Sequence, residues 1–325
     1  MSDEVAKRIA NFIAPFRVEP GSTVDLRKDY DPGYKASFLR KRDSVDLLQR
    51  VVTGLTEYQA RLAAQDTYGV IVVLQALDAA GKDGTIRHVM SGVNPQGVHV
   101  YSFKVPSAEE LDHDYLWRYA KRLPGRGEIA IFNRSHYEEV LVVRVHQEIL
   151  ARQKLPPQAR TDDVWRRRYH EINNWERHLV DNGFRVVKLF LNLSKEEQRT
   201  RFLRRIDLPD KNWKFSAADV RERRRWDDYQ EAFSEMLSHT STEEAPWYVL
   251  PADHKWFGRI GAAAVIANTL IEIDPRFPAV DEQARRDLLT VKADLEDQAL
   301  DGAAADPFQQ ELADAADARD KSGVR

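Results

Sequence analysis

Length, composition and charge exclude several classes of protein. The chain has 325 residues, a formal net charge of -3 and no cysteine. This balance gives no overall attraction to nucleic acid or membrane, and the lack of cysteine excludes disulfides, thiolate metal sites and thiol catalysis. Met1 to Arg17 lack the pattern of a secretory signal, and no apolar segment approaches bilayer length. We therefore expect a soluble cytoplasmic protein with no nucleic-acid or membrane partner.

The first 65 residues predict a helical extension that packs on the core that follows. Prolines and glycines interrupt its beginning, and a helical pattern then runs from about Lys35 through Leu62. Apolar residues recur in this pattern at spacings of three and four, namely Leu47, Leu48, Val51, Val52, Leu55 and Tyr58. One face of the helix should therefore be apolar and contact the core.

Short apolar runs alternate with helical segments through residues 66–274, which we take as the catalytic core. Five runs predict strands, at residues 69–77, 98–105, 128–133, 185–193 and 247–250. Near-continuous Val, Ile and Leu runs are typical of strands buried on both faces, as in a parallel sheet covered by helices. The predicted fold class is therefore α/β, a three-layer α/β/α sandwich with a five-stranded parallel sheet.

The last segment, residues 275–325, has a different composition. It is rich in Ala, Asp, Glu and Gln, and its residues 301–325 offer few side chains that could fill a core. We predict an exposed acidic helix followed by a disordered tail.

The loop after the first predicted strand has the pattern of a phosphate-binding loop. A strand, a loop of small residues, a Gly-Lys pair and a helix together direct backbone N–H groups and a lysine at phosphate. The residues that we predict to bind phosphate are Ala79, Ala80, Gly81, Lys82, Asp83 and Gly84. Two positions depart from the G-x-x-x-x-G-K-[ST] pattern, because Ala76 replaces the first glycine and Asp83 replaces the hydroxyl residue. The alternative is a tight turn made by Gly81 and Gly84.

Carboxylates beside this loop indicate a divalent cation. Asp78 and Asp83 would lie close to anionic phosphate, which is unfavourable unless a cation lies between them. We predict that Mg²⁺ is the cofactor and that Asp78 is its ligand, with Asp83 as a possible helper.

The third predicted strand ends in Asn133-Arg134-Ser135-His136-Tyr137-Glu138. Ligands of open α/β sheets bind at the carboxyl edge of the strands, where these side chains should lie. Arg134 could stabilise a transferring phosphoryl group, and Glu138 could hold a second metal or a water. The alternative, left open by the residues alone, is a strand end at which Arg134 pairs with a local carboxylate. The predicted catalytic residues are thus Asp78, Lys82, Arg134 and Glu138.

Positive charge concentrates in a helical insertion at about residues 195–239, between the fourth and fifth strands. Arg201, Arg204 and Arg205 share one helix face by their spacing, and three arginines from Arg221 repeat it. The cations that we predict to contact a polyanion are Arg204, Arg205, Lys211, Lys214, Arg221 and Arg224. A solvated surface and a nucleic-acid groove are the alternatives. The position of the insertion favours a lid over the phosphate loop.

Three motifs, residues 78–84, residues 133–138 and the segment from Arg204 to Ser216, closely resemble the second polyphosphate kinase family. The resemblance covers roughly residues 35 to 270. It implies a P-loop kinase fold related to thymidylate kinase, Mg²⁺-dependent transfer between inorganic polyphosphate and nucleotides, and a basic channel for the polymer. Family members act on nucleoside diphosphates, on monophosphates or on both.

The resemblance also suggests roles for single residues. Asp78 resembles the metal-binding aspartate of the family, Lys82 its loop lysine and Arg134 its second-motif arginine. Many members have Asp where this chain has Asn133, and Asn where it has Glu138. This combination resembles the subtype that phosphorylates AMP and then ADP, and it leaves a metal-ligand role for Asn133 unassigned. The segment with Arg204, Arg205, Lys211 and Lys214 matches the basic lid of the family.

We therefore expect reversible transfer from polyphosphate to adenine and guanine nucleotides, by a homo-oligomer that is a dimer or a tetramer. An ATP-dependent nucleotide kinase of the thymidylate kinase type is the alternative enzyme. A non-catalytic P-loop nucleotide-binding module is the alternative from another class. The donor that supports turnover would separate the three.

Overall fold

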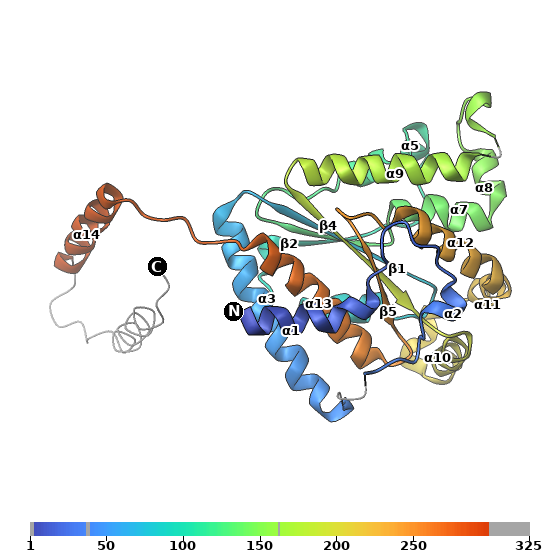
Figure 1. Cartoon of the computed structure of the whole chain (residues 1–325), viewed down its shortest axis with the longest axis horizontal. Coiled ribbons are helices and arrows are strands. Elements are labelled where there is room, and N and C mark those ends of the chain that lie inside the picture. The colour runs from blue at the N-terminus through green and yellow to red at the C-terminus, as the bar shows by residue number, and fades with distance from the viewer. Residues whose placement is uncertain (1–2, 37–39, 162, 299–325) are drawn as a thin grey trace. The chain divides into compact units, whose positions relative to one another are not determined.

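The computed structural model describes residues 3–36, 40–161 and 163–298 (Figure 1). One compact unit ends at Phe277, and the residues from Pro278 onward form a second unit. The second unit contains helix α14 (Glu282–Asp297), which has no buried residue. The composition predicts such an exposed helix. The disordered tail predicted for residues 301–325 lies outside the described residues.

Five parallel strands form the sheet of the first unit, in the order β2-β3-β1-β4-β5. They are β1 (Gly69–Ala76), β2 (Val98–Ser102), β3 (Ile129–Asn133), β4 (Phe184–Asn192) and β5 (Trp247–Pro251). All five predicted strands are confirmed, although β2 ends at Ser102 rather than Val105. Since β1 lies between β3 and β4, the polar segments that follow β1 and β3 lie side by side at one edge of the sheet.

Alternate side chains of β1 enter two separate apolar cores. Val70, Val72 and Leu74 pack in the core formed with α1 (Asp3–Ile13), α3 (Ser44–Gln65) and α13 (Lys255–Ile273). Ile71 and Val73 pack in the core formed with α9 (Val164–Asp181) and α12 (Trp226–Thr240). Figure 1 shows these two groups of helices on opposite sides of the sheet, so the predicted three-layer sandwich is confirmed.

Two expectations about buried segments are wrong in detail. The edge strand β2 is only partly buried, and Val100 is 48% exposed, because one side of this strand has no neighbouring strand. We predicted no apolar segment of bilayer length, but helix α13 is long and apolar enough to cross a membrane by length and composition. Its most apolar window is 67% buried in the fold, which accounts for the composition.

The helix predicted from about Lys35 begins later, because Lys41–Asp43 form a 3-10 turn and α3 starts at Ser44. The apolar face of α3 packs against α13 as predicted, through Leu55, Tyr58 and Leu62. The shorter helices are α2 (Leu26–Asp29), α4 (Lys82–Val89), α5 (Ala108–Asp112), α6 (Trp117–Ala120), α7 (Val142–Val145) and α8 (Gln147–Arg152). The other 3-10 segments are Ala14–Phe16, Pro95–Gly97, His136–Val140 and Pro157–Ala159.

The basic insertion contains three α-helices and a 3-10 segment. It comprises α10 (Lys195–Asp207), the 3-10 segment Pro209–Lys214, α11 (Ala217–Arg224) and α12. Helix α12 belongs to the core rather than to a lid, because Tyr229, Phe233 and Met236 are buried beneath the sheet. The lid predicted for residues 195–239 therefore does not include α12, because the apolar spacing at this end of the insertion buries the helix.

Candidate active site

The loop between β1 and α4, residues 77–81, brings the first motif to the carboxyl edge of the sheet. Ala79 (φ 64°) and Gly81 (φ 110°) both adopt left-handed backbone conformations. Such a conformation costs an alanine on the order of 1 kcal/mol, and it persists where surrounding contacts hold it. Lys82 is the first residue of α4, so the loop ends at the partly positive N-terminus of a helix.

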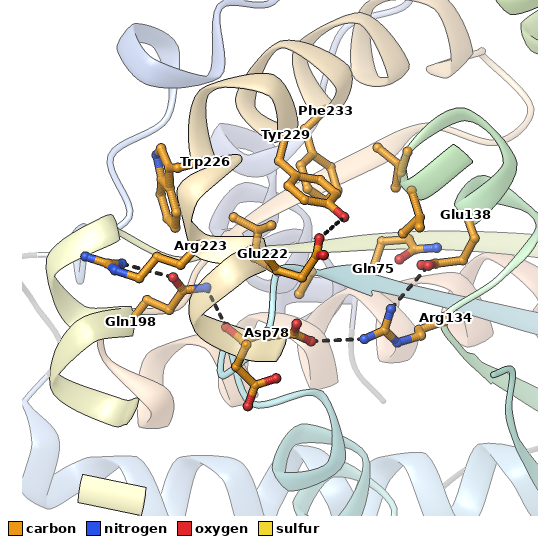
Figure 2. A pocket seen from close by; sticks show the side chains of 15 residues that line it. Gln75, Asp78, Arg134, Glu138, Gln198, Glu222, Arg223, Trp226, Tyr229 and Phe233 are labelled. Atoms are coloured by element: carbon orange, nitrogen blue, oxygen red, sulfur yellow. Dashed lines mark hydrogen bonds and ion pairs between the residues drawn. The ribbon is translucent and has the colours of Figure 1, made fainter. Parts of the chain in front are cut away.

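Arg134 joins the first motif to the motif after β3. Its guanidinium lies 3.0 Å from the Asp78 carboxylate and 3.2 Å from the Glu138 carboxylate. Figure 2 shows Arg134 between the two acids, each reached by a different nitrogen. Arg134 itself has a left-handed backbone, with φ 66°. The local pairing considered from the sequence is present, and it places Arg134, Asp78 and Glu138 in one cluster.

Lys82 lies beside this cluster and donates hydrogen bonds to the carbonyl oxygens of Ala76 (2.8 Å) and Leu77 (3.5 Å). Burial and repulsion from Arg134 lower the pKa of Lys82 to about 8, against partial compensation by Asp78, Glu138 and Asp83. Attraction to Glu138 raises the pKa of Arg134. Arg134 therefore stays charged, while the charge of Lys82 depends on pH and on what binds near it.

The donor atoms at this edge fit a magnesium ion that also takes ligands from a substrate. Among the residues that the structure describes, no group of three or more His, Asp or Glu side chains could hold a metal alone. Mg²⁺ commonly binds through one or two carboxylates together with substrate phosphates. The Oδ1 atom of Asn133 is buried without a hydrogen-bond partner, and its Nδ2 donates to Asp83 at 2.9 Å. Carboxylate and amide oxygens, the kinds of ligand that Mg²⁺ binds in proteins, thus lie near the loop.

A cavity of about 850 Å³ extends from the loop to the insertion and to the start of α13. Its lining includes every predicted phosphate-binding residue, from Ala79 to Gly84. Ten cationic side chains line it: Lys82, Arg87, Lys104, Arg134, Arg201, Arg204, Arg205, Lys211, Lys255 and Arg259. Only Asp78 and Asp83 oppose them among the described lining residues. The cavity therefore suits an extended polyanion.

The cations of the insertion divide into three groups. Arg204, Arg205 and Lys211 line the cavity as predicted, with Trp213 beside them. Arg221 and Arg224 are exposed and lie outside the described lining, because α11 directs Glu222 and Arg223 towards the body of the protein instead. The side chain of Lys214 lies outside the described residues.

Sequence reasoning missed Arg87, Lys255 and Arg259. Lys255 and Arg259 stand one helical turn apart at the start of α13, directly after the last strand, and this spacing was the available signal. Burial and nearby cations, Arg201 among them, lower the pKa values of Lys255 and Arg259. These cations repel one another until an anion lies between them, which is typical of a binding site.

Helix α11 reaches the catalytic cluster through polar contacts. Glu222 accepts hydrogen bonds from His146 (2.9 Å) and Tyr229 (2.8 Å). Arg223 donates to Gln198 (3.0 Å), which donates to the backbone carbonyl of Asp78 (3.0 Å). Figure 2 shows Gln198, Glu222, Arg223 and Tyr229 around a small pocket of about 40 Å³ that Asp78, Arg134 and Glu138 also line. Because α11 has no buried residue, these contacts carry its attachment.

The segment after Arg134 rests on a buried polar cluster. The Glu176 carboxylate accepts hydrogen bonds from Tyr137 (2.8 Å) and Lys188 (2.7 Å) and lies 3.1 Å from His136. Burial lowers the pKa of His136. With every member away from solvent, the cluster fixes the chain just before Glu138.

Comparisons with known proteins place this geometry in a family. Residues 39–277 match the model of the family described as polyphosphate kinase 2. The chain is 49% identical over 284 residues to an "ADP-polyphosphate phosphotransferase" of Rhodopseudomonas palustris, covering 86% of this chain and 97% of the relative. An "AMP/ADP-polyphosphate phosphotransferase" of Meiothermus ruber is 44% identical over 264 residues, covering 81% and 94%.

A solved structure agrees with these relatives. The crystal structure of polyphosphate kinase 2 from Arthrobacter aurescens superposes with a TM-score of 0.76 at 37% sequence identity, over 84% of this chain and 95% of that chain. The P-loop kinase-like fold expected from the motifs is therefore confirmed. The chain belongs to the polyphosphate kinase 2 family.

Proposed function

We propose that this enzyme transfers phosphoryl groups from inorganic polyphosphate to nucleoside monophosphates and diphosphates, with Mg²⁺ as cofactor. The observation that carries the proposal is the cavity in which ten cations and two carboxylates surround the β1–α4 loop. The phosphates of one nucleotide carry fewer negative charges than these ten side chains carry positive charges. A polyphosphate chain carries enough. The names of the two relatives above support the same donor.

The residues of the site divide the work of the transfer. A terminal phosphate oxygen of the acceptor attacks the terminal phosphorus of the polymer, one P–O bond forms, and the bond to the shortened polyphosphate breaks. Lys82 and Arg134 place positive charge beside the transferring group, where negative charge must be stabilised. Asp78 would hold Mg²⁺, which would supply further charge stabilisation when bound. Because a phosphoanhydride bond forms as another breaks, the reaction is reversible.

We assign acceptor choice to Glu138. Its carboxylate lies 3.2 Å from Arg134, next to the position proposed for the metal at Asp78. A diphosphate places its terminal oxygen one phosphate further from the nucleoside than a monophosphate does. A carboxylate here can adjust the position of Arg134 for both acceptors. The relative named for both AMP and ADP supports this subtype.

Three wider predictions accompany the proposal. We expect adenine and guanine nucleotides as acceptors, a cytoplasmic location, and a dimer or tetramer. The cytoplasmic location follows from the composition and the other two from the sequence resemblance. They await fractionation, nucleotide panels and solution mass measurement.

The test is a comparison of phosphate donors. The full chain is incubated with Mg²⁺, AMP and either long-chain polyphosphate or ATP, and ADP and ATP are resolved over time. We expect ADP followed by ATP with polyphosphate, and little ADP when ATP is the donor. Efficient ADP formation from AMP and ATP would indicate the nucleotide kinase instead. Nucleotide binding without turnover from either donor would indicate the binding module.

A further inference from the structure

We propose that Arg201 is a positioning residue, which holds the β1–α4 loop in its phosphate-binding conformation. Arg201 lies on α10, in the insertion, and is 4% exposed. It shares one helix face with Arg204 and Arg205, which are predicted to contact the polymer, but its hydrogen bonds indicate a different role. The inference rests on the proposed function, since it assigns the loop a reaction to serve.

Every N–H group of the Arg201 side chain is directed at a protein acceptor. One terminal nitrogen donates to the carbonyl oxygens of Ala79 (3.0 Å) and Ala80 (2.7 Å). The other donates to the carbonyl oxygens of Ala252 (2.5 Å) and Asp253 (3.1 Å). The Nε atom donates to Glu197 at 2.8 Å. An arginine has five donors, so all five are engaged and none is left for phosphate.

These bonds fix the orientation of two peptide groups in the loop. In a trans peptide, the carbonyl and the following N–H point in opposite directions. Because Arg201 holds the Ala80 carbonyl, the N–H of Gly81 must point away from the guanidinium. Ala79, whose carbonyl accepts the other hydrogen bond, has a left-handed backbone, and such a conformation persists where surrounding contacts hold it. By binding carbonyl oxygens on one side of the loop, Arg201 leaves the N–H of Gly81 directed to the other side, where it can bind an anion.

Arg201 also sets the spacing between two parts of the cavity. Ala252 and Asp253 lead from β5 into α13, which carries Lys255 and Arg259 near its start. The same guanidinium therefore connects the β1–α4 loop to the segment just before these two cations. A lysine at this position keeps the charge but lacks the planar fork that serves four carbonyls at once. We therefore expect Arg201→Lys to impair the loop without removing the charge.

The kinetic test compares Arg201→Lys and Arg201→Ala with Arg199→Lys and Arg199→Ala in the polyphosphate-dependent assay. Arg199 lies on the same helix, is 54% exposed at its side chain and pairs with Glu196, outside the described lining of the cavity. We expect at least a tenfold fall in kcat for both Arg201 variants, with less than a threefold change in KM for polyphosphate. We also expect guanidinium at about 20 mM to raise kcat of Arg201→Ala at least fivefold and to leave both Arg199 variants unchanged.

A rise in KM with an unchanged kcat would overturn the proposal, because Arg201 would then bind the polymer directly. An unchanged kcat with an unchanged KM would also overturn it. Hydrogen exchange of the peptide covering residues 76–84 keeps the test independent of turnover. We expect exchange at least tenfold faster in Arg201→Lys than in wild type or Arg199→Lys, and equal rates would refute the positioning role even if polyphosphate proved not to be the donor.

Discussion

The lowered pKa of Lys82 leads to a specific prediction about pH. An ordinary lysine remains charged to about pH 10.4, whereas burial and Arg134 lower the pKa of Lys82 to about 8. This lowering of the pKa corresponds to about 3 kcal/mol of differential interaction between the two protonation states. Phosphate favours the charged lysine, so binding above pH 8 must take up a proton. We expect kcat/KM for polyphosphate to fall about tenfold per pH unit above pH 8.

Replacing the lysine by arginine isolates the cause. Arginine stays charged throughout this range, so Lys82→Arg should have lower activity but a flat profile from pH 7 to about pH 9.5. Lys211→Arg, the same exchange elsewhere in the cavity, should keep the falling limb. Initial rates at low polyphosphate concentration, measured at half-unit intervals of pH, give the profile. A flat wild-type profile, or a falling limb that persists in Lys82→Arg, would refute the reasoning.

Stability should change in the opposite direction over the same range. The unfolded state retains the Lys82 proton up to about pH 10.4, whereas the folded state loses it near pH 8. Between these values the unfolded state binds more protons, so the Lys82 contribution makes the folded state more stable as pH rises. Comparing urea unfolding of wild type and Lys82→Met at pH 7.5 and pH 9.5 tests the sign. A wild-type gain over Lys82→Met is expected, and a relative loss would contradict it.

Three further predictions concern the metal, the polymer and the acceptor. Asp78→Asn should lose at least a hundredfold in kcat and need more Mg²⁺, because one ligand charge is lost; an unchanged Mg²⁺ titration would exclude Asp78 as a ligand. Arg204→Glu with Arg205→Glu should raise KM for polyphosphate at least tenfold more than KM for AMP, and equal rises would assign this part of the lid to the nucleotide. Glu138→Asn should slow one of the two steps, AMP to ADP or ADP to ATP, at least tenfold more than the other, which is about 1.4 kcal/mol. Parallel losses would remove Glu138 from acceptor selection.

Features with local causes could be predicted from the sequence. The capping box of Ser107 and Glu110 is present at the start of α5, and Gly183 takes the left-handed conformation expected of a helix stop, with φ 83°. The strands followed from uninterrupted apolar runs. The placement of Asp78 and Arg134 at one edge of the sheet could be predicted, because the carboxyl ends of parallel strands share that edge. Their direct contact depends on β1 and β3 being neighbours, which only the structure shows.

Features that depend on distant partners could not be predicted in this way. Spacing placed Arg201 with Arg204, but only the folded chain brings it to the carbonyls of Ala79 and Ala252. The cationic role of Lys255 was hidden because α13 is otherwise an apolar core helix. An arginine that binds backbone carbonyls and an arginine that binds a ligand have the same sequence pattern. Only the tertiary contacts distinguish the two roles.

The position of the lid cations has a consequence for how the donor is consumed. Arg204, Arg205 and Lys211 line one part of the cavity and Lys255 and Arg259 line another, so a long polymer spanning the cavity links the insertion to the start of α13. Each turnover shortens that link by one phosphate. Processivity should therefore end once the remaining chain no longer reaches from Lys211 to Arg259. The enzyme would then release a short oligophosphate of defined length rather than degrade the polymer to completion.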